Sequence, residues 1–227
     1  MKPVHKLFEG NIFDMKPLEK GLVFVYSSED AEGTVRAAYN MISFDTGRMS
    51  PVTTSNYLLA KFGIRFKTYK KKAASIFESK VLHLPGDRVF ILDPDGSANI
   101  YDIDGAVLWS SSLLYTDACP TDIALYNDSL WACFKEHNSL IRFNLNTMHE
   151  ERRIGGGEKS PFNRPVQITA AQDGLVICNS ASNSIIKLDP LNYSIDLMYD
   201  FRESVKGYLK VQDKEFAALS SGLYFIY

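Results

Sequence analysis

"PTDIALYNDSLWACFKEHNSLIRFNL" spans residues 120–145, and "PVQITAAQDGLVICNSASNSIIKLDP" spans residues 165–190. With an offset of 45 and no gap, the two stretches carry the same residue at eight positions. These positions are Pro120/Pro165, Ile123/Ile168, Asp128/Asp173, Leu130/Leu175, Cys133/Cys178, Asn138/Asn183, Ser139/Ser184 and Ile141/Ile186. A repeat of about 40–50 residues is typical of propellers and solenoids. The chain is therefore predicted to contain repeated structural units.

Each unit divides into four short strands. In the second copy these are residues 167–170, 175–178, 184–188 and 194–198, with the turn "QDG" after the first strand. Apolar residues do not recur at helical spacing anywhere in the copy. Repeated four-stranded sheets arranged around an axis are the blades of a β-propeller.

The same pattern extends outward to residues 21–53, 86–112 and 207–227. The last stretch has three strands and then the chain ends, while "VHKLFEG" (4–10) is a spare strand at the other end. The sequence predicts an all-β fold: a single five-bladed β-propeller of four-stranded antiparallel blades, closed by an N-terminal strand that completes the last blade. The single domain (1–227) is predicted to contain blades at residues 11–53, 54–112, 113–156, 157–200 and 201–227 plus 4–10.

A family resemblance supports this architecture. "IGGGEKSPFNRPVQITAAQDGLVICNSASNSIIKLD" (154–189) resembles an NHL-type propeller repeat, although Asn179 stands where that family usually has Asp. "YDIDGAVLW" (101–109) is similar to the outer corner of quinoprotein-like propellers. The resemblance implies a fold and no particular activity, because propellers host many functions. The residues that match the NHL pattern are Gly155, Gly156, Gly157, Phe162, Pro165, Asp173, Gly174, Asn183 and Ile186.

Composition narrows the class of protein. The net charge of −2 and pI near 6.1 indicate no general attraction to nucleic acid or an anionic membrane. No apolar run reaches the roughly 18 residues of a membrane span, and the first residues have no secretory signal pattern. Three cysteines without paired spacing favour reduced thiols. We therefore expect a cytoplasmic protein that does not enter a membrane.

A basic insert at residues 55–78 is the most unusual stretch. Alternating apolar and polar residues between 62 and 69 predict an extra hairpin or extended strand that presents cations. One interpretation is a binding site for an anionic partner: an acidic protein, a phosphorylated ligand or, less favoured, nucleic acid. The other is a solvated sheet edge on which lysines prevent aggregation. The predicted binding residues are Lys61, Arg65, Lys67, Lys70, Lys71 and Lys72.

Acidic residues are predicted to gather at one rim of the ring, where the turns between second and third strands meet the connections between blades. An alternative site there would use carboxylates for calcium binding or acid–base chemistry. Ordinary turn chemistry explains the same residues, because Asp and Asn stabilise tight turns. Asp14 invites comparison with the acid on the first inner strand of five-bladed glycosidases, but the surrounding pattern is absent. The rim residues are Asp93, Asp95, Glu136, His137 and Asn179, with Glu29, Asp30 and Glu32 in the first blade.

The glycines at 155–157 are not predicted to form a phosphate loop. Glu158 occupies the place where such a loop needs glycine, and Pro161 removes a backbone amide. The chain also lacks a Gly-x-Ser-x-Gly elbow. We therefore expect a non-catalytic binding or scaffold module, without a cofactor, that recognises a protein or an anionic ligand. The alternative is a hydrolase or lyase at the acidic rim, with calcium as the candidate metal.

Overall fold

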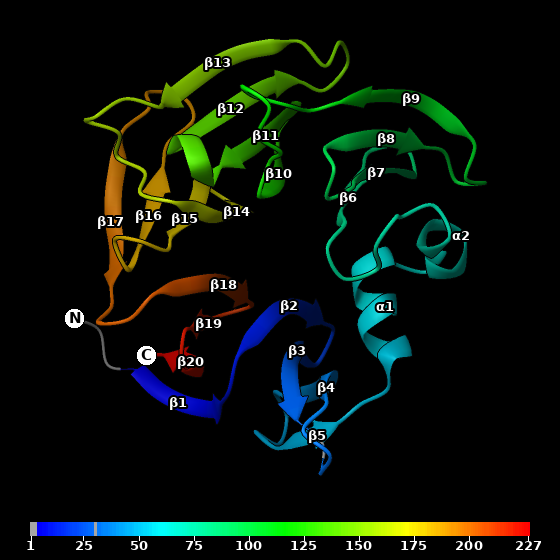
Figure 1. Ribbon diagram of the computed structural model, residues 1–227, viewed down its shortest axis with the longest axis vertical. Coiled ribbons are helices and arrows are strands. Elements are labelled where there is room, and N and C mark those ends of the chain that lie inside the picture. The colour runs from blue at the N-terminus through cyan, green and yellow to red at the C-terminus, as the bar shows by residue number, and fades with distance from the viewer. Residues whose placement is uncertain (1–3, 30) are drawn as a thin grey trace.

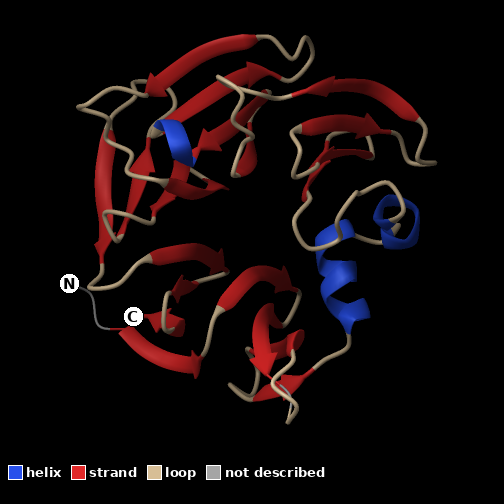
Figure 2. Cartoon of the chain, viewed as in Figure 1, coloured by secondary structure: helices blue, strands red, loops and turns tan. Residues whose placement is uncertain are grey.

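Five four-stranded antiparallel sheets form a ring in the computed structural model, which describes residues 4–29 and 31–227 (Figures 1 and 2). The prediction of a five-bladed propeller is confirmed. The first four blades are β2 to β5, β6 to β9, β10 to β13 and β14 to β17, and the fifth is built from β18, β19, β20 and β1.

Each blade has its innermost strand at one end of the sheet. These inner strands, β2, β6, β10, β14 and β18, surround the axis of the ring. The strands are β1 (Val4–Glu9), β2 (Ile12–Leu18), β3 (Gly21–Glu29), β4 (Val35–Ser43), β5 (Met49–Pro51), β6 (Lys80–Leu84), β7 (Arg88–Leu92), β8 (Ser97–Tyr101), β9 (Val107–Ser112), β10 (Asp122–Tyr126), β11 (Ser129–Phe134), β12 (Ser139–Asn144), β13 (Glu150–Gly155), β14 (Pro165–Ala171), β15 (Gly174–Asn179), β16 (Ser184–Leu188), β17 (Ile195–Asp200), β18 (Val205–Val211), β19 (Lys214–Leu219) and β20 (Gly222–Ile226).

The N-terminal strand closes the ring, as the sequence predicts. Strand β1 pairs antiparallel with β20 from Val4 opposite Ile226 to Glu9 opposite Gly222. At Gly222 a Cβ atom would lie 2.0 Å from the carbonyl oxygen of Phe8, so only glycine permits this close approach. The two ends of the chain thus share one sheet and leave no open blade.

The sequence repeat has a direct structural meaning. Asn138 and Asn183 both adopt left-handed backbone conformations, with φ of 49° and 55°, just before the third strand of their blades. Asparagine tolerates this region better than most residues. Cys133 and Cys178 are both buried in the second strand, as small apolar side chains would be. The identical residues therefore mark backbone and packing requirements of the blade.

The basic insert is not an extended hairpin, so that prediction is wrong. It forms helices α1 (Thr54–Phe62) and α2 (Phe66–Lys70), separated by a turn in which Gly63 has φ of 71°. Tyr57, Leu58 and Phe62 are buried at helical spacing, and this period outweighs the alternation read from the sequence. No helix among the described residues is long and apolar enough to cross a membrane.

Helix α1 fills the junction between the first two blades (Figures 1 and 2). At the other four junctions the inner strands of neighbouring blades contact each other directly. Here the buried side chains of Tyr57 and Phe62 pack with Val23 and Val25 of β3 on one side. On the other side they share the same core with Ile91 of β7. The insert therefore supplies the apolar packing that joins the two blades.

Candidate functional site

Five structurally equivalent positions, one on each inner strand, line a small cavity at the centre of the ring. Their equivalence follows from register, because each pairs with the corresponding residue of the second strand in its blade. In three blades a β-bulge comes immediately before the position. We call the five residues the channel ring: Asp14 opposite Val25, Lys80 opposite Leu92, Asp122 opposite Cys133, Gln167 opposite Cys178, and Gly207 opposite Ala218.

Side chains of the channel ring link one blade to the next. The carboxylate of Asp122 accepts a hydrogen bond of 3.1 Å from the backbone N–H of Ile168 in the following blade. In the same way, Oε1 of Gln167 accepts one of 2.5 Å from the N–H of Tyr208. Asp122 and Gln167 thus each satisfy the amide that follows the next ring position, which is how these two polar residues are tolerated here.

The first blade satisfies the equivalent amide differently. Gly207 has no side chain to reach it, and Asp14 Oδ1 accepts a hydrogen bond of 2.8 Å from Met15 N–H instead. The other carboxylate oxygen accepts one of 2.8 Å from the hydroxyl of Tyr57 on α1, and Lys16 Nζ lies 3.2 Å from Oδ1. Asp14 is therefore saturated with donors and ties α1 to the channel.

Neighbouring groups determine the ionisation of Asp14 and Lys80 in the channel ring. Burial alone would raise the pKa of Asp14, but Lys16, Lys80 and Lys61 outweigh it and hold the pKa below its ordinary value. Lys80 Nζ lies 3.6 Å from Asp122, and this carboxylate raises the lysine's pKa against the effect of burial. Asp14 and Lys80 of the channel ring are therefore both charged at neutral pH.

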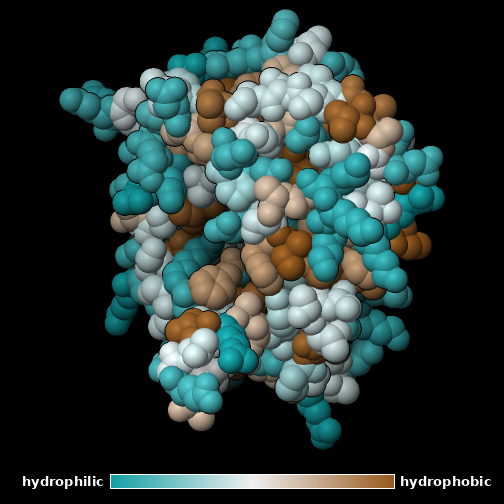
Figure 3. Space-filling model, turned by 45° about the vertical axis from the view of Figure 1, so that its right-hand side comes forward, coloured by the Kyte–Doolittle hydropathy of each residue, from teal (hydrophilic) through white to brown (hydrophobic). Residues whose placement is uncertain are grey.

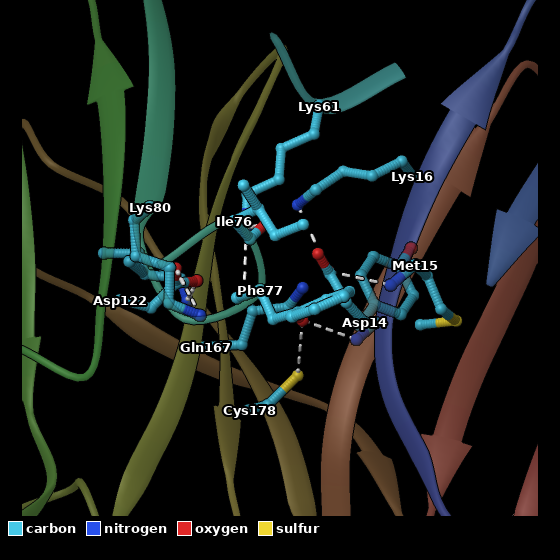
Figure 4. Close-up of polar contacts among 12 residues, drawn as sticks. Asp14, Met15, Lys16, Lys61, Ile76, Phe77, Lys80, Asp122, Gln167 and Cys178 are labelled. Atoms are coloured by element: carbon cyan, nitrogen blue, oxygen red, sulfur yellow. Dashed lines mark hydrogen bonds and ion pairs between the residues drawn. The ribbon is translucent and has the colours of Figure 1, made fainter. Parts of the chain in front are cut away.

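Lys61 of α1 faces inward rather than outward (Figure 4). Lys61 is only 4% exposed, and its Nζ donates hydrogen bonds of 2.9 Å to the carbonyl oxygens of Ile76 and Phe77. Burial lowers the pKa of Lys61 to about 7, an effect that Asp14 partly offsets. An amine with this pKa is partly neutral under physiological conditions.

Two larger cavities open from the ring. The first, which we call the mouth cavity, has a volume of about 630 Å³ and is bounded by the first three blades and the insert. The second, the channel cavity, has a volume of about 430 Å³ and lies along the inner strands, where Lys61 contributes to its wall. Asp14 and Lys80 line both cavities, so they stand where the two meet.

The wall of the mouth cavity combines aromatic and charged side chains. The rings of Tyr57 and Phe77 stack at an interplanar angle of 16°, with centroids 6.4 Å apart. Two of the phenylalanines that line it are exposed, Phe77 at 44% and Phe13 at 60%. Exposed aromatic side chains in a concave site with a few charged groups are typical of ligand-binding pockets.

The six predicted basic residues do not form one surface. Lys61 points into the channel, whereas Arg65 donates to the carbonyl oxygen of Ile103 and pairs with Asp104 at 3.5 Å. Lys72 Nζ lies 5.7 Å from the centroid of the Tyr101 ring. Hydrophilic side chains dominate the face on which the insert comes forward (Figure 3). Four lysines of the set are exposed: Lys67, Lys70, Lys71 and Lys72.

Asp93, one of the predicted rim residues, has a structural role that its position in a turn did not reveal. It is buried and accepts hydrogen bonds from the Ser79 hydroxyl at 2.5 Å and the Ala74 N–H at 2.9 Å. It thereby anchors the end of the insert to the second blade. Asp95 accepts a hydrogen bond from Ser97 N–H at 2.9 Å, which is ordinary turn chemistry.

The remaining rim residues have separate partners. Glu136 pairs with Arg164 at 3.6 Å, and the His137 ring lies edge-on against Tyr115, with centroids 4.8 Å apart. Asn179 is buried and accepts a hydrogen bond from the backbone at residue 163. The structure does not bring these side chains together around one point.

The described residues provide no set of side chains that could bind calcium at the rim. Within residues 4–29 and 31–227, no cluster of three or more His, Cys, Asp or Glu side chains could hold a metal ion. Asp30, which belongs to the predicted rim, lies outside the described residues.

Sequence reasoning missed most of the channel ring, although one signal was present. The alignment of the two repeats sets Asp122 over Gln167, a polar pair two residues after the matched prolines. A polar residue at the start of an inner strand faces the axis, so the aligned pair could have been identified as channel residues. Lys80 had no comparable signal, because its blade begins after an irregular insert.

Comparison with known proteins supports the fold and goes no further. No protein family matches the sequence, and no curated protein matches it either. Among solved structures, a streptogramin B lyase is 11% identical, with a TM-score of 0.56 over 99% of this chain and 97% of the lyase. Virginiamycin B lyase from Staphylococcus aureus is 13% identical, with a TM-score of 0.54 over 99% of both chains. Glutaminyl cyclase from Myxococcus xanthus is 9% identical, with a TM-score of 0.52 over 98% of this chain and 94% of the cyclase. At such identities the likeness shows a β-propeller fold alone.

Substituting Lys61 with Met should change how stability depends on pH. The pKa of Lys61 is about 7 in the folded state and near its ordinary 10.5 when unfolded, so the unfolded state binds more protons between these values. The wild-type free energy of unfolding should therefore gain up to about 1.4 kcal/mol per pH unit in this window relative to Lys61→Met. Urea unfolding at pH 7, 8 and 9 measures this difference. The exposed Lys67→Met variant should show no such trend, and parallel pH profiles for wild type and Lys61→Met would contradict the burial of an amine.

Proposed function

We propose that this chain is a binding protein that takes a small anionic molecule with an apolar body in the mouth cavity. The observation that carries the proposal is a cavity of about 630 Å³ in which exposed aromatic rings flank a charged floor. This volume lies in the range of pockets for small organic molecules. The proposal requires no chemistry from the protein.

The apolar part of the ligand would lie between the walls of the cavity. Phe13 and the stacked rings of Tyr57 and Phe77 all line this cavity. Covering the exposed rings with an apolar group removes their surface from water, which supplies a favourable free energy of binding. A flat aromatic ligand fits this arrangement best.

The preferred charge of the ligand depends on which polar groups in the cavity can still form hydrogen bonds. The carboxylates of Asp14 and Asp93 already accept hydrogen bonds from protein donors. Lys80 has three N–H donors and forms an ion pair with Asp122, and Lys135 lines the cavity with its side chain 41% exposed. Donors with spare capacity favour an acceptor-rich, negatively charged group on the ligand.

Benzoate and benzamidine test this preference, because they share a shape and differ in charge. Benzoate should bind at least about fivefold more tightly than benzamidine, as expected when one ion pair contributes about 1 kcal/mol. Titrations followed by NMR chemical shifts would report the affinities and place the changes at Phe13, Tyr57 and Phe77.

Two lysine variants complete this experiment. Lys80→Met should weaken benzoate binding by at least about fivefold, and Lys67→Met on the outer helix should leave it unchanged. The proposal fails if benzamidine binds as tightly as benzoate, or if neither compound binds saturably.

The alternative activity, a hydrolase or lyase at the acidic rim, has weaker support. A general acid or base must reach a substrate, whereas Asp93 is buried against Ser79 and Glu136 is paired with Arg164. Release of product from candidate esters or glycosides by the purified protein would favour this alternative over simple binding.

The exposed lysines of the insert provide a second candidate binding surface, for an acidic protein. Lys67, Lys70, Lys71 and Lys72 are exposed on and just after α2, and Ile64 beside them is 93% exposed. An apolar residue within a basic surface is a common arrangement at protein interfaces. This surface lies outside the mouth cavity, so the two proposals are independent.

The triple substitution Lys70→Glu, Lys71→Glu and Lys72→Glu should abolish capture of an acidic partner from cell lysate, because like charges repel. Quantitative mass spectrometry of captured proteins measures the loss. The charge-matched control Lys20→Glu, Arg48→Glu and Lys159→Glu changes three exposed basic residues elsewhere and should retain capture. Equal capture by all three proteins would reject this surface.

The repeat class and the compartment also remain proposals. The NHL-like assignment is supported by the buried Phe162 and by the left-handed backbone of Asn183, and free variation of these residues among relatives would contradict it. A cytoplasmic location is supported by three free cysteines, two of them buried. Recovery of the protein from an oxidising compartment would contradict that location.

A further inference from the structure

Three lysines converge on the channel, where only two carboxylates face them. Lys16, Lys61 and Lys80 line the channel cavity together with Asp14 and Asp122. They come from three separate elements, β2, α1 and β6, which belong to the first two blades and the insert between them (Figure 4). Such a cluster is unusual in a protein interior, because charged groups lose hydration there.

Lys61 differs from the other two lysines in its partners. Lys16 pairs with Asp14 and Lys80 with Asp122, whereas Lys61 Nζ donates to the neutral carbonyls of residues 76 and 77. A neutral amine has two N–H groups and one lone pair, so these two acceptors satisfy both of its protons. The contacts of Lys61 thus suit an uncharged amine as well as an ammonium ion.

Burial favours the uncharged form of Lys61. Burial is the largest influence on its pKa, which falls to about 7, and the ammonium groups of Lys16 and Lys80 act in the same direction. Asp14 and Asp122 act in the opposite direction without reversing the shift. A desolvated lysine beside other cations is the environment that activates an amine as a nucleophile.

We infer that Lys61 is an amine nucleophile that forms an imine with a small carbonyl compound bearing an acidic group. This inference rests on the proposed function, because the acidic group would be held by Lys80 in the mouth cavity. Lys80 lines both cavities and Lys61 lines the channel cavity, so a ligand held by the first can extend its carbonyl toward the second.

The reaction needs no other reagent. The lone pair of Nζ forms a bond to the carbonyl carbon, and the π electrons of the C=O bond move to oxygen. A proton passes from nitrogen to that oxygen to give a carbinolamine. Loss of the hydroxyl group with the second nitrogen proton releases one water molecule and leaves a C=N bond, so the products are an imine and water.

Reductive trapping with glyoxylate, a small anionic aldehyde, tests the inference on the folded wild-type protein. Sodium cyanoborohydride reduces any imine to a stable secondary amine, and peptide mapping by mass spectrometry then locates it. At pH 7 roughly half of Lys61 is neutral, compared with about one in a thousand for a lysine of ordinary pKa. We expect Lys61 to be labelled at least about ten times faster than any other lysine, with a rate that rises through pH 7.

Two comparisons separate the contributions of charge and of the amine. Acetaldehyde, which lacks the acidic group, should label Lys61 more slowly than glyoxylate, and excess benzoate should slow labelling by glyoxylate. Lys61→Arg keeps the positive charge and the donors to the two carbonyls but cannot form an imine under these conditions, so it should lose the label at this site.

Selective labelling of Lys61 that benzoate slows would support the inference. Labelling spread evenly over the exposed lysines, or equal labelling of Lys61 by both aldehydes, would overturn it. Benzoate binding measured without borohydride separates the two proposals: if benzoate binds and Lys61 is not selectively labelled, the binding function stands and the nucleophile falls.

Discussion

Packing of α1 between the first and second blades is the interaction on which the rest of the structure depends. A propeller remains closed only if every junction between blades is filled, and at this junction a helix replaces direct contact between inner strands. The fully buried Tyr57 and Phe62 contact the cores of both blades. Burial of side chains of this size stabilises a fold by roughly 1.5–3 kcal/mol each, so the helix is part of the core rather than a surface addition.

The same packing creates the candidate site. One face of α1 fills the junction, and that face also carries Tyr57 to Asp14 and Lys61 to the carbonyls of residues 76 and 77. The axis of the ring thereby receives the phenol of Tyr57 and the amine of Lys61 from outside the blade strands. A buried hydroxyl and a buried amine both need partners, and here the partners come from the first blade and from the segment that leads into the second. Stability and binding chemistry therefore depend on one element.

The sequence allowed the fold to be predicted because blades repeat. The matched Asn138 and Asn183 mark the same turn, and the unpaired strand at residues 4–10 indicated how the ring closes. The insert could not be derived in the same way, because it occurs once and follows the local rules of a helix within a chain of strands. The alternation of apolar and polar residues between 62 and 69 suggested a strand. Contact with two blade cores instead stabilises a helix, whose apolar residues recur at helical spacing.

The site was harder to predict than the fold for a physical reason. Its residues come from five blades and a helix, and each is an ordinary polar residue within its own segment. Their significance comes from the register that places one residue of each inner strand at the same height in the channel. The rim acids were more conspicuous in sequence, yet Asp93 anchors the insert and Asp95 stabilises a turn.

Amide hydrogen exchange across α1 tests most directly whether this helix is part of the folded core. If it joins the two blades, amides of residues 58–62 should exchange as slowly as those of β7, because both open only when the ring opens. Exchange of these amides at the rate of an exposed loop, while β7 remains protected, would contradict the role of α1 in closing the ring and in placing Lys61 in the channel.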